Sequence, residues 1–539
     1  MKIVILGAGI GGLTVAHELM HRGTRPYDIH IYERNAIIGG MARSGYKERQ
    51  GVMLPTEYSW RIYGPNYDNL REILKEIPLQ DTPDKSVHDN LVDLHDYLIA
   101  DTDAILKMNN GMKTLFDLRA ALKDVSLREK LTVLRKICYC FMISDDHLNA
   151  LDNMSWKDYI DPGDGLSHNT KKYIVDIMGP YLGAELNQVN VPSVVKTLES
   201  FKLWNRPISV MLGPTNEAWF NHWYSHLKAK GVTFHFNSNV VDIATTDKSV
   251  THAVLSDGSM ISGDVFYCSL PVESVAAMPT LEMPDIKTLA ARAHQLMVAI
   301  QFYFDKKITF DNKNTGMYIP DSPWQLVIEP QGSIWNKQYG DIKDIWSIGL
   351  CDPVRNGLLI QKPFIHCNEK EIKDEVWYQL THSSLNTFLK LDEVTVLDYQ
   401  LWDTYVHNGK QLVTNEPKFS TNKGTYFLRP NNNTQYENFH FATAYTKTDT
   451  DMFEMESAAE SGRLAARLLE PSISAFKIDR ILLFAPYQML DRLLCKLNLY
   501  QRYTFTWLLL GSPLLVLMPF IYIKRRIKAK KKHKIAVTA

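Results

Sequence analysis

Three glycines near the start of the chain have the spacing of a phosphate-binding turn. Gly7, Gly9 and Gly12 follow a short apolar run at residues 2–6, and residues 13–22 after them have apolar residues at helical spacing. In such a turn the first glycine permits a tight bend, the second lets the backbone approach a pyrophosphate, and the third lets the helix pack close to the strand. Free N–H groups at the helix start then face the phosphates. The pattern predicts a dinucleotide site.

An acidic residue stands where a carboxylate can hold a ribose. A second strand is expected at residues 29–32 and Glu33 closes it, about twenty residues beyond the glycines. A carboxylate there can accept hydrogen bonds from both ribose hydroxyls and disfavours a 2′-phosphate. Strand, helix, second strand and acid occur in the required order, which favours a nucleotide site over a glycine-rich turn without a ligand. The predicted contacts of this unit are Gly7, Gly9, Ile10, Gly11, Gly12, Glu33 and Arg34.

The residues after the second strand indicate which dinucleotide is bound. Residues 38–44, Ile-Gly-Gly-Met-Ala-Arg-Ser, resemble the GG(R/K)xRS segment of the superfamily that includes phytoene desaturases, amine oxidases and protoporphyrinogen oxidase. In those families the glycines run along the flavin diphosphate and the arginine supports the isoalloxazine side. The resemblance therefore implies FAD rather than NAD as the cofactor. It adds Gly39, Gly40, Met41, Ala42 and Arg43 to the predicted site.

Further blocks, spread over most of the chain, match the same superfamily. Residues 57–67 resemble an aromatic segment that lies near the substrate side of the flavin in desaturase-like proteins. Residues 213–243 resemble a block of the phytoene-dehydrogenase-like or hydroxysqualene-dehydroxylase-like subgroup, in which a valine backbone holds adenine. Residues 438–463 resemble the closing motif, whose strand and helix N-terminus cap the flavin. These resemblances imply cofactor contacts from Val240, Tyr445, Thr446 and Met455.

The closing motif departs from the superfamily pattern. Thr443 and Ala444 replace the usual Gly-Asp, and Ser457 replaces a glycine. The missing aspartate normally touches the ribityl or pyrophosphate group, and losing one charge-assisted contact would weaken binding by about 1.5–3 kcal/mol. Glu454 occupies the position of one of the two aromatic side chains that form the cage of amine oxidases. This substitution disfavours a standard amine oxidase.

The resemblance implies an oxidation. A flavin accepts hydride at N5, and the protein positions a C–H bond and excludes water. We expect an apolar, isoprenoid-like or lipid substrate that loses hydride in a desaturase-like reaction. A flavin amine oxidase and a flavin-binding scaffold without turnover stay open as alternatives. The sequence assigns neither a catalytic residue nor an electron acceptor.

Composition is that of a folded globular protein with two or three domains. Of the 539 residues, 45% are apolar and 22% are charged. The formal net charge is 0, so no global field attracts nucleic acid, and we expect none as a partner. The six cysteines include no CxxC pair, which favours reduced thiols over a metal site. The oligomeric state is left open.

The chain is predicted to have an α/β fold. It combines a Rossmann-type, glutathione-reductase-like FAD-binding domain with an interleaved α+β substrate domain and a C-terminal membrane segment. The predicted boundaries are 1–75, 213–275 and 426–470 for the FAD-binding parts, 76–212 for a mostly helical substrate-domain part, 276–425 for its part with a sheet, 471–502 for an interfacial amphipathic segment, 503–523 for the membrane segment and 524–539 for a basic tail.

The membrane prediction rests on the C-terminal residues. Residues 503–523 carry no charge and are about long enough to cross a bilayer core of roughly 30 Å. The basic tail favours the cytoplasmic side. The catalytic domain is also expected in the cytosol, because the first strand begins at Lys2 with no signal peptide before it. Since both ends on one side conflict with a single span, a tail-anchored span and a re-entrant hairpin bent at Pro513 and Pro519 stay open.

Overall fold

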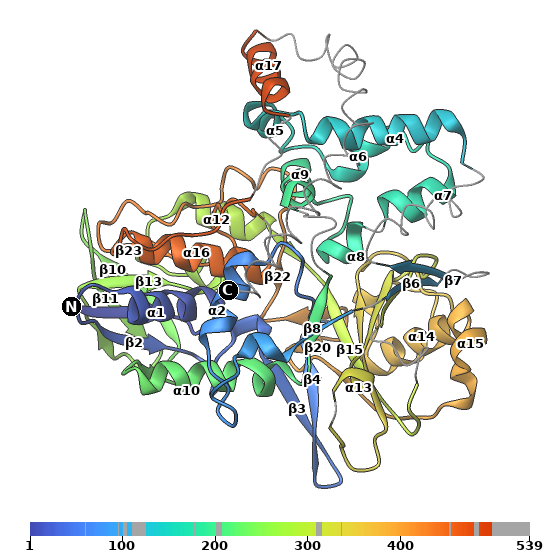
Figure 1. The fold of residues 1–539 in the computed structure, drawn as a ribbon, viewed down its shortest axis with the longest axis horizontal. Helices are drawn as coiled ribbons and strands as arrows, with labels where there is room; N and C mark the ends of the chain where they lie inside the picture. Colours follow the sequence, from blue (N-terminus) through green and yellow to red (C-terminus); the bar gives the residue numbers. More distant parts are fainter. Residues whose placement is uncertain are drawn as a thin grey trace, which may run out of the picture.

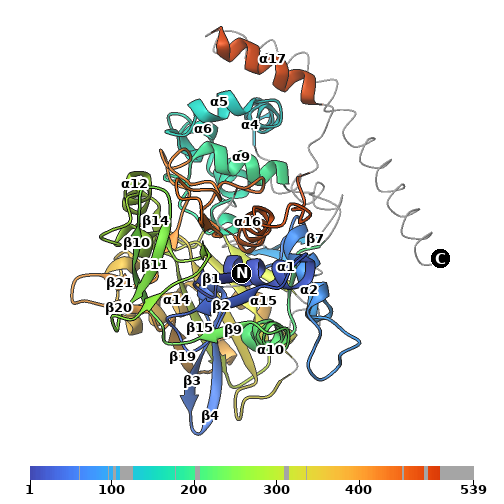
Figure 2. The same cartoon turned by 90° about the vertical axis from the view of Figure 1, so that its left-hand side faces the viewer.

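The computed structural model describes residues 1–59, 61–94, 96–100, 105–109, 125–176, 178–200, 207–308, 315–335, 337–451, 454–478 and 484–497. Within these residues the chain forms a nucleotide-binding domain, a sheet domain built on a large mixed sheet, and a helical lobe (Figure 1). The lobe lies at one end of the molecule in both views (Figure 2).

The nucleotide-binding domain is built on a five-stranded parallel sheet. From edge to edge its strands are β23 (Phe439–Phe441), β13 (Val265–Cys268), β1 (Lys2–Leu6), β2 (Asp28–Tyr32) and β9 (Thr233–His235). Strands from the start, middle and end of the chain therefore lie side by side. Parallel strands need cover on both faces, which explains why β1 is a continuous apolar run.

Helices and a small sheet cover the two faces of this parallel sheet. One face packs on α1 (Ile10–Arg22), α2 (Asp68–Glu76), α10 (Asn221–Ala229) and α16 (Met455–Arg467). The other packs on β10 (Val240–Thr245), β11 (Val250–Leu255), β12 (Met260–Ile261), α11 (Val272–Ala276) and α12 (Pro284–Arg292). The carboxyl ends of the parallel strands remain at an open edge, where ligands bind in such folds.

The sheet domain has seven strands, which are antiparallel except for the pair β16–β6. In order they are β19 (Val396–Leu401), β15 (Val298–Phe304), β18 (Asp344–Leu350), β17 (Leu326–Pro330), β16 (Thr315–Ile319), β6 (Asp96–Ala100) and β7 (Ile105–Asn109). α14 (Glu369–Thr381) and α15 (Ser384–Leu389) pack on this sheet. β6 and β7 come from the part expected to be mostly helical. The predicted domain boundaries themselves stay a prediction.

Short hairpins and pairs join the domains. They are β3 (Ser44–Arg49) with β4 (Val52–Glu57), β5 (Leu91–Asp93) with β8 (Ser209–Met211), β14 (His294–Gln295) with β22 (Lys418–Phe419), and β20 (Tyr405–His407) with β21 (Leu412–Thr414). The pair β14–β22 matters for function, because it brings residue 418 from late in the chain next to residue 295.

The helical lobe is held together by a buried polar contact as well as by apolar packing. Its helices are α4 (Leu127–Cys140), α5 (Asp145–Ala150), α6 (Trp156–Ile160), α7 (His168–Thr170), α8 (Met178–Leu182), α9 (Val191–Ser200) and α17 (Ala485–Lys496). Asp491 of α17 is buried and accepts hydrogen bonds from Tyr139 Oη at 2.9 Å and from the Ser144 N–H at 2.7 Å. This contact docks one face of α17 on the lobe.

The predicted C-terminal membrane segment requires a correction of the fold class. Among the described residues no helix is both long and apolar enough to cross a membrane. The longest, α4, has 14 residues and spans about 21 Å, whereas a bilayer core is about 30 Å thick. Residues 503–523 and the basic tail lie outside the described residues. The described residues therefore form a Rossmann-type nucleotide-binding domain with a second domain, and the membrane segment of the predicted fold class is not supported.

Candidate functional site

A cavity opens at the carboxyl ends of the parallel strands, where the nucleotide-binding domain meets the sheet domain and the lobe. It is lined by Gly7 after β1, Glu33 after β2, Ser269 after β13 and Thr443 after β23. The sequence-predicted residues that line it are Gly7, Gly9, Ile10, Gly11, Glu33, Arg34, Gly39, Gly40, Met41, Ala42, Arg43, Val240, Tyr445 and Met455. Residues from distant blocks of the chain are thus brought to one site.

Gly12 and Thr446 are the two predicted residues that lie behind the cavity wall. A Cβ on Gly12 would come within 2.9 Å of Ile5 Cγ2, so this glycine permits close packing of α1 on β1. Its N–H donates to Ser269 Oγ at 2.9 Å. Thr446 is fully buried and donates from Oγ1 to the carbonyl of Thr443 at 2.8 Å. Both residues shape the wall.

The glycine-rich turn forms a cradle with the chemistry that a diphosphate needs. A Cβ on Gly9 would meet no atom closer than Ser269 Oγ at 3.6 Å, so it would project into the cavity. Gly9 is the N-cap of α1 and no side chain caps this helix end. Gly39 and Gly40 have positive φ values of 117° and 56°, and a Cβ on Gly40 would lie 3.2 Å from Gly9 Cα. The arrangement fits a dinucleotide diphosphate.

Glu33 connects the cradle to the ribose side of the cavity. The residue is 5% exposed, and its Oε2 accepts from the Ala8 N–H at 2.8 Å. Its Oε1 accepts from the N–H of Asn35 at 2.9 Å and from Asn35 Nδ2 at 2.8 Å. A carboxylate has about four lone-pair sites, so acceptor capacity remains for hydroxyl groups. Glu33 therefore both orders the glycine turn and presents its carboxylate to the cavity.

Two predicted arginines meet on one carboxylate that the sequence did not suggest. Arg43 Nη2 lies 3.0 Å from both oxygens of Glu416, and Arg34 Nη2 lies 2.6 Å from Glu416 Oε1. The Arg43 guanidinium also lies 5.3 Å from the ring centroid of Trp402. Glu416 thus fixes the orientation of both cations at the cavity wall. No motif marks Glu416, and only the folded chain brings it to Arg34 and Arg43.

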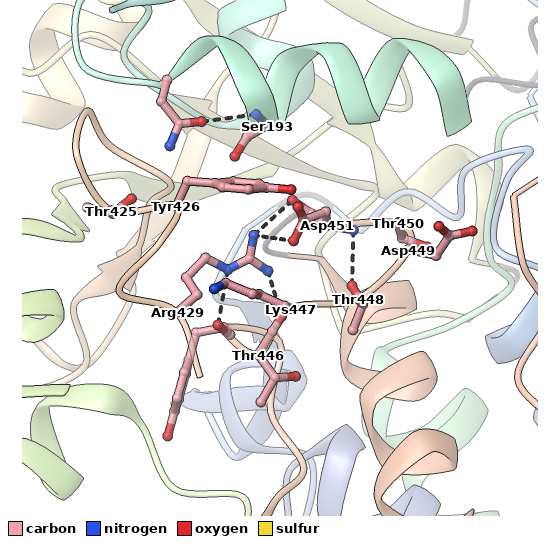
Figure 3. Close-up of polar contacts among 12 residues, drawn as sticks. Ser193, Thr425, Tyr426, Arg429, Thr446, Lys447, Thr448, Asp449, Thr450 and Asp451 are labelled. Carbon is pink, nitrogen blue, oxygen red and sulfur yellow. Dashed lines mark hydrogen bonds and ion pairs between the residues drawn. The ribbon is translucent and has the colours of Figure 1, made fainter. Parts of the chain in front are cut away.

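Arg429 holds the closing loop after β23 in place. The side chain is fully buried, and it donates to the carbonyls of Tyr445 at 3.1 Å and Thr446 at 2.6 Å (Figure 3). It also forms an ion pair with Asp451 and donates to the Asp451 carbonyl at 3.2 Å. This loop carries Tyr445 and leads to Glu454 and Met455 on the cavity wall. Arg429 positions the wall from behind rather than facing a ligand.

The part of the cavity wall away from the glycine cradle is mostly apolar. Its apolar and aromatic side chains are Tyr58, Ile62, Tyr67, Leu182, Met297 and Phe419. Tyr58, Ile62 and Tyr67 belong to residues 57–67, the segment predicted near the substrate. Trp60 of that segment lies outside the described residues. Charged side chains interrupt this surface at Arg61, Lys418 and Glu454. Arg61 is engaged, because its Nη2 donates to the Met41 carbonyl at 2.7 Å. The cavity therefore joins a diphosphate cradle to a largely apolar compartment.

Two family models match the chain. Residues 5–77 match a family described as NAD(P)-binding Rossmann-like domain, and residues 223–469 match one described as Flavin containing amine oxidoreductase. Together they contain the glycine cradle and the closing motif.

Known proteins of similar sequence include desaturases. The chain is 22% identical over 490 residues to a 15-cis-phytoene desaturase, chloroplastic/chromoplastic, of Solanum lycopersicum, which covers 87% of this chain and 77% of that protein. The corresponding protein of Capsicum annuum is 22% identical over 491 residues, covering 87% and 78%.

Solved structures share the fold. A putrescine oxidase bound to putrescine matches with a TM-score of 0.60 at 11% identity, covering 87% of this chain and 99% of that one. An oxidoreductase from Methanosarcina mazei matches with a TM-score of 0.55 at 13% identity, covering 88% and 100%.

Fold and site together define a dinucleotide-binding oxidoreductase. The chain belongs to the superfamily of flavin amine oxidases and phytoene desaturases, and it is an FAD-dependent oxidoreductase. The predictions of the superfamily, of FAD as the cofactor and of enzymatic activity are confirmed. The alternative of a scaffold without turnover is accordingly set aside. The roles of the individual residues in binding FAD stay predictions.

Proposed function

We propose that this enzyme oxidises an apolar, isoprenoid-like or other lipid substrate in a desaturase-like reaction at a membrane surface. The observation that carries the proposal is the apolar compartment that shares one cavity with the glycine cradle. An apolar molecule gains free energy by leaving water for such a compartment. The similarity to 15-cis-phytoene desaturases supports the same substrate class.

In this proposal the parts of the cavity have separate roles. The cradle of Gly7, Gly9 and the start of α1 binds the diphosphate, and Glu33 binds the ribose. When bound, FAD supplies an acceptor for hydride. Tyr58, Ile62 and the other apolar side chains of the compartment exclude water and hold the substrate chain against the cofactor site.

Contact with a membrane is supported by apolar residues on the outside of the helical lobe. Leu127, Leu131 and Leu134 of α4 are 72%, 56% and 51% exposed. On α17, Met489, Leu493 and Leu497 are 72%, 52% and 56% exposed. Their spacing places each set along one helical face. Exposed Arg128, Arg135, Arg492 and Lys496 flank these residues. Such amphipathic helices lie in the boundary between anionic headgroups and acyl chains.

Anaerobic titration of the holoenzyme tests the substrate class. The purified protein is expected to show oxidised flavin absorbance that an apolar polyene bleaches and that simple amines leave unchanged. Bleaching by amines but not by polyenes would overturn the proposal and favour a flavin amine oxidase.

The amine oxidase remains the second candidate because of Glu454. Its carboxylate lines the cavity and could attract an ammonium group. Lys418 lines the same cavity and repels such a cation, which favours the lipid substrate.

Vesicle binding tests the membrane surface. We expect Leu131→Asp combined with Leu493→Asp to lower affinity for vesicles containing anionic lipid at least several-fold, because a charge opposes burial among acyl chains. Val406→Asp is the matched control, since Val406 is 59% exposed on β20, outside the lobe. Equal vesicle affinity of the two variants would contradict docking through α4 and α17.

A further inference from the structure

Lys418 and Glu454 are two ionisable residues in the apolar compartment to which the proposed function gives no role. Lys418 lies on β22, and Glu454 directly precedes α16. Both line the main cavity and also a smaller one beside it. A compartment for a pure hydrocarbon needs neither group, because each must give up water when the compartment fills.

Glu454 has an acceptor left over, and one of the three donors of Lys418 has only a weak acceptor. Lys418 Nζ donates to the carbonyls of Leu182, at 3.1 Å, and Gly183, and its remaining acceptor is the weakly accepting Met297 Sδ at 3.5 Å. Glu454 Oε2 accepts from Tyr67 Oη at 2.7 Å. Within the described part of the chain, nothing donates to Glu454 Oε1. A ligand oxygen can therefore replace Met297 Sδ as the acceptor of Lys418, and a ligand hydroxyl can donate to Glu454 Oε1.

The two groups influence each other without touching. Burial raises the pKa of Glu454 to about 7, and the charge of Lys418 opposes this rise. Burial lowers the pKa of Lys418 to about 8, and the charge of Glu454 opposes this fall. Among the described residues no hydrogen bond or ion pair joins them directly. Because both line the same two cavities, a polar group of a ligand bound there can be offered to both side chains.

The chemistry of the pair selects among ligand head groups. A hydrocarbon would leave a buried donor and a buried acceptor unpaired. An ammonium group would be repelled by Lys418, and a carboxylate by Glu454. A hydroxyl group can accept from Lys418 Nζ and donate to Glu454 Oε1 at the same time. We propose that Lys418 and Glu454 bind the hydroxyl group of an otherwise apolar substrate, so that the enzyme prefers a lipid alcohol to the corresponding hydrocarbon. This inference rests on the proposed function.

Binding of matched isoprenoids to the oxidised holoenzyme tests the pair. The probes are farnesol, farnesene and farnesylamine, which share a chain and differ in the head group. Binding is followed by the shift of flavin absorbance and by tryptophan fluorescence, without turnover. We expect wild-type enzyme to bind farnesol about tenfold more tightly than farnesene, the difference made by one added hydrogen-bonded contact.

Substitutions assign the preference to the pair. Glu454→Met and Lys418→Met keep the approximate size of each side chain and remove its hydrogen-bonding group. Each variant is expected to bring farnesol and farnesene close to equal affinity. Glu273→Gln is the control, because Glu273 lines the same cavity but is not one of the pair. The Glu273→Gln enzyme should prefer farnesol to farnesene as strongly as the wild type does. Flavin content and far-UV circular dichroism show that each variant is folded. If one variant does not fold, the farnesol preference of the other variant still tests the role of the pair.

The outcomes separate this inference from the proposed function. Equal wild-type affinity for farnesol and farnesene would overturn the role of the pair and leave the apolar substrate class in place. A preference that survives in both variants would also overturn that role. Binding of farnesylamine alone, or of none of the three by a flavin-loaded enzyme, would overturn both proposals.

Discussion

Glu33 performs two tasks with one carboxylate, which makes it a sensitive residue. It holds the Ala8 N–H of the glycine turn at 2.8 Å while facing the ribose side of the cavity. Glu33→Gln keeps the size but replaces one acceptor oxygen by a donor. We expect FAD affinity to fall about ten- to a hundredfold, or about 1.4–2.8 kcal/mol. Fluorescence titration of the flavin-free protein with FAD measures this. The exposed control Glu48→Gln should bind normally, and equal affinity of the two variants would contradict the role.

His17 in α1 is a second residue whose surroundings fix its chemistry. It is fully buried, Trp223 Nε1 donates to its Nδ1 at 3.3 Å, and its Nε2 lies 2.9 Å from Glu76 Oε2. The proton of the neutral ring therefore sits on Nε2 and is donated to Glu76. Both ring nitrogens are engaged, and burial lowers the pKa of His17 to about 3.

Stability is expected to decrease in acid because of His17. Between the ordinary pKa of 6.5 and about 3, the unfolded chain binds a proton on this residue that the folded chain does not bind. Stability is thus full above pH 6.5 and falls at lower pH, by up to about 1.4 kcal/mol per pH unit. Urea denaturation of the wild type and of His17→Gln at pH 7, 6 and 5 measures the slope. A glutamine can still accept from Trp223 and donate to Glu76 but does not titrate. Identical slopes would contradict the prediction.

At the scale of the element, two glycines at the start of α1 allow effects on folding and on cofactor binding to be tested separately. A Cβ on Gly11 would overlap the carbonyl of Ala442 at the end of β23. A Cβ on Gly9, the N-cap of α1, would make only an ordinary contact with Ser269 Oγ at 3.6 Å, and the Gly9 φ of −76° suits alanine. We expect Gly11→Ala to destabilise the fold by at least about 2 kcal/mol, because backbone must move. Gly9→Ala should fold normally and bind FAD poorly.

Urea denaturation and FAD titration of the two variants check this contrast. A Gly9→Ala variant that binds FAD as the wild type does would show that the cradle is not the diphosphate site. A Gly11→Ala variant as stable as the wild type would show that α1 and the end of β23 can move apart without loss of stability.

The sequence predicted structural elements that neighbouring residues specify. It did not predict contacts that form only when distant segments of the chain pair. The sequence placed the first strand, the helix after the glycines and the second strand, because β1, α1 and β2 follow one another within residues 2–32. Glu416 and Lys418 carry no motif. Lys418 reaches the cavity only because β22 pairs with β14, with Lys418 opposite Gln295. β6 likewise joins the sheet domain through parallel pairing with β16, which no local pattern announces.

At the scale of the whole molecule, the superfamily blocks predicted the Rossmann-type fold, and the structure has it. The C-terminal membrane segment of the predicted fold class is not supported, because the described helices have at most 14 residues and none is long and apolar enough to cross a membrane. The interfacial amphipathic segment predicted at residues 471–502 contains α17. The exposed apolar residues of α4 were not predicted, because only the folded lobe shows which face of α4 is buried.

The cofactor is expected to stabilise distant parts of the chain together. The cavity is lined by Gly7, Ser269 and Thr443, which follow β1, β13 and β23 and come from the start, middle and end of the chain. FAD at a hundredfold excess over its Kd should add about 2.7 kcal/mol to the stability of the folded state. Hydrogen exchange with and without FAD should therefore show added protection in all three strands and in α16.

The pattern of protection distinguishes two ways of binding. Because one ligand contacts all three segments, none of them can open while FAD remains fully bound, and their protection should rise by a similar factor. α17 contributes no residue to the cavity and should change little. Gly9→Ala should show no rise at the same FAD concentration. Protection confined to β1, α1 and β2 would mean that the local β-turn-α-β unit alone binds the nucleotide. The closing motif, with Thr443 and Ala444, would then not contact the cofactor.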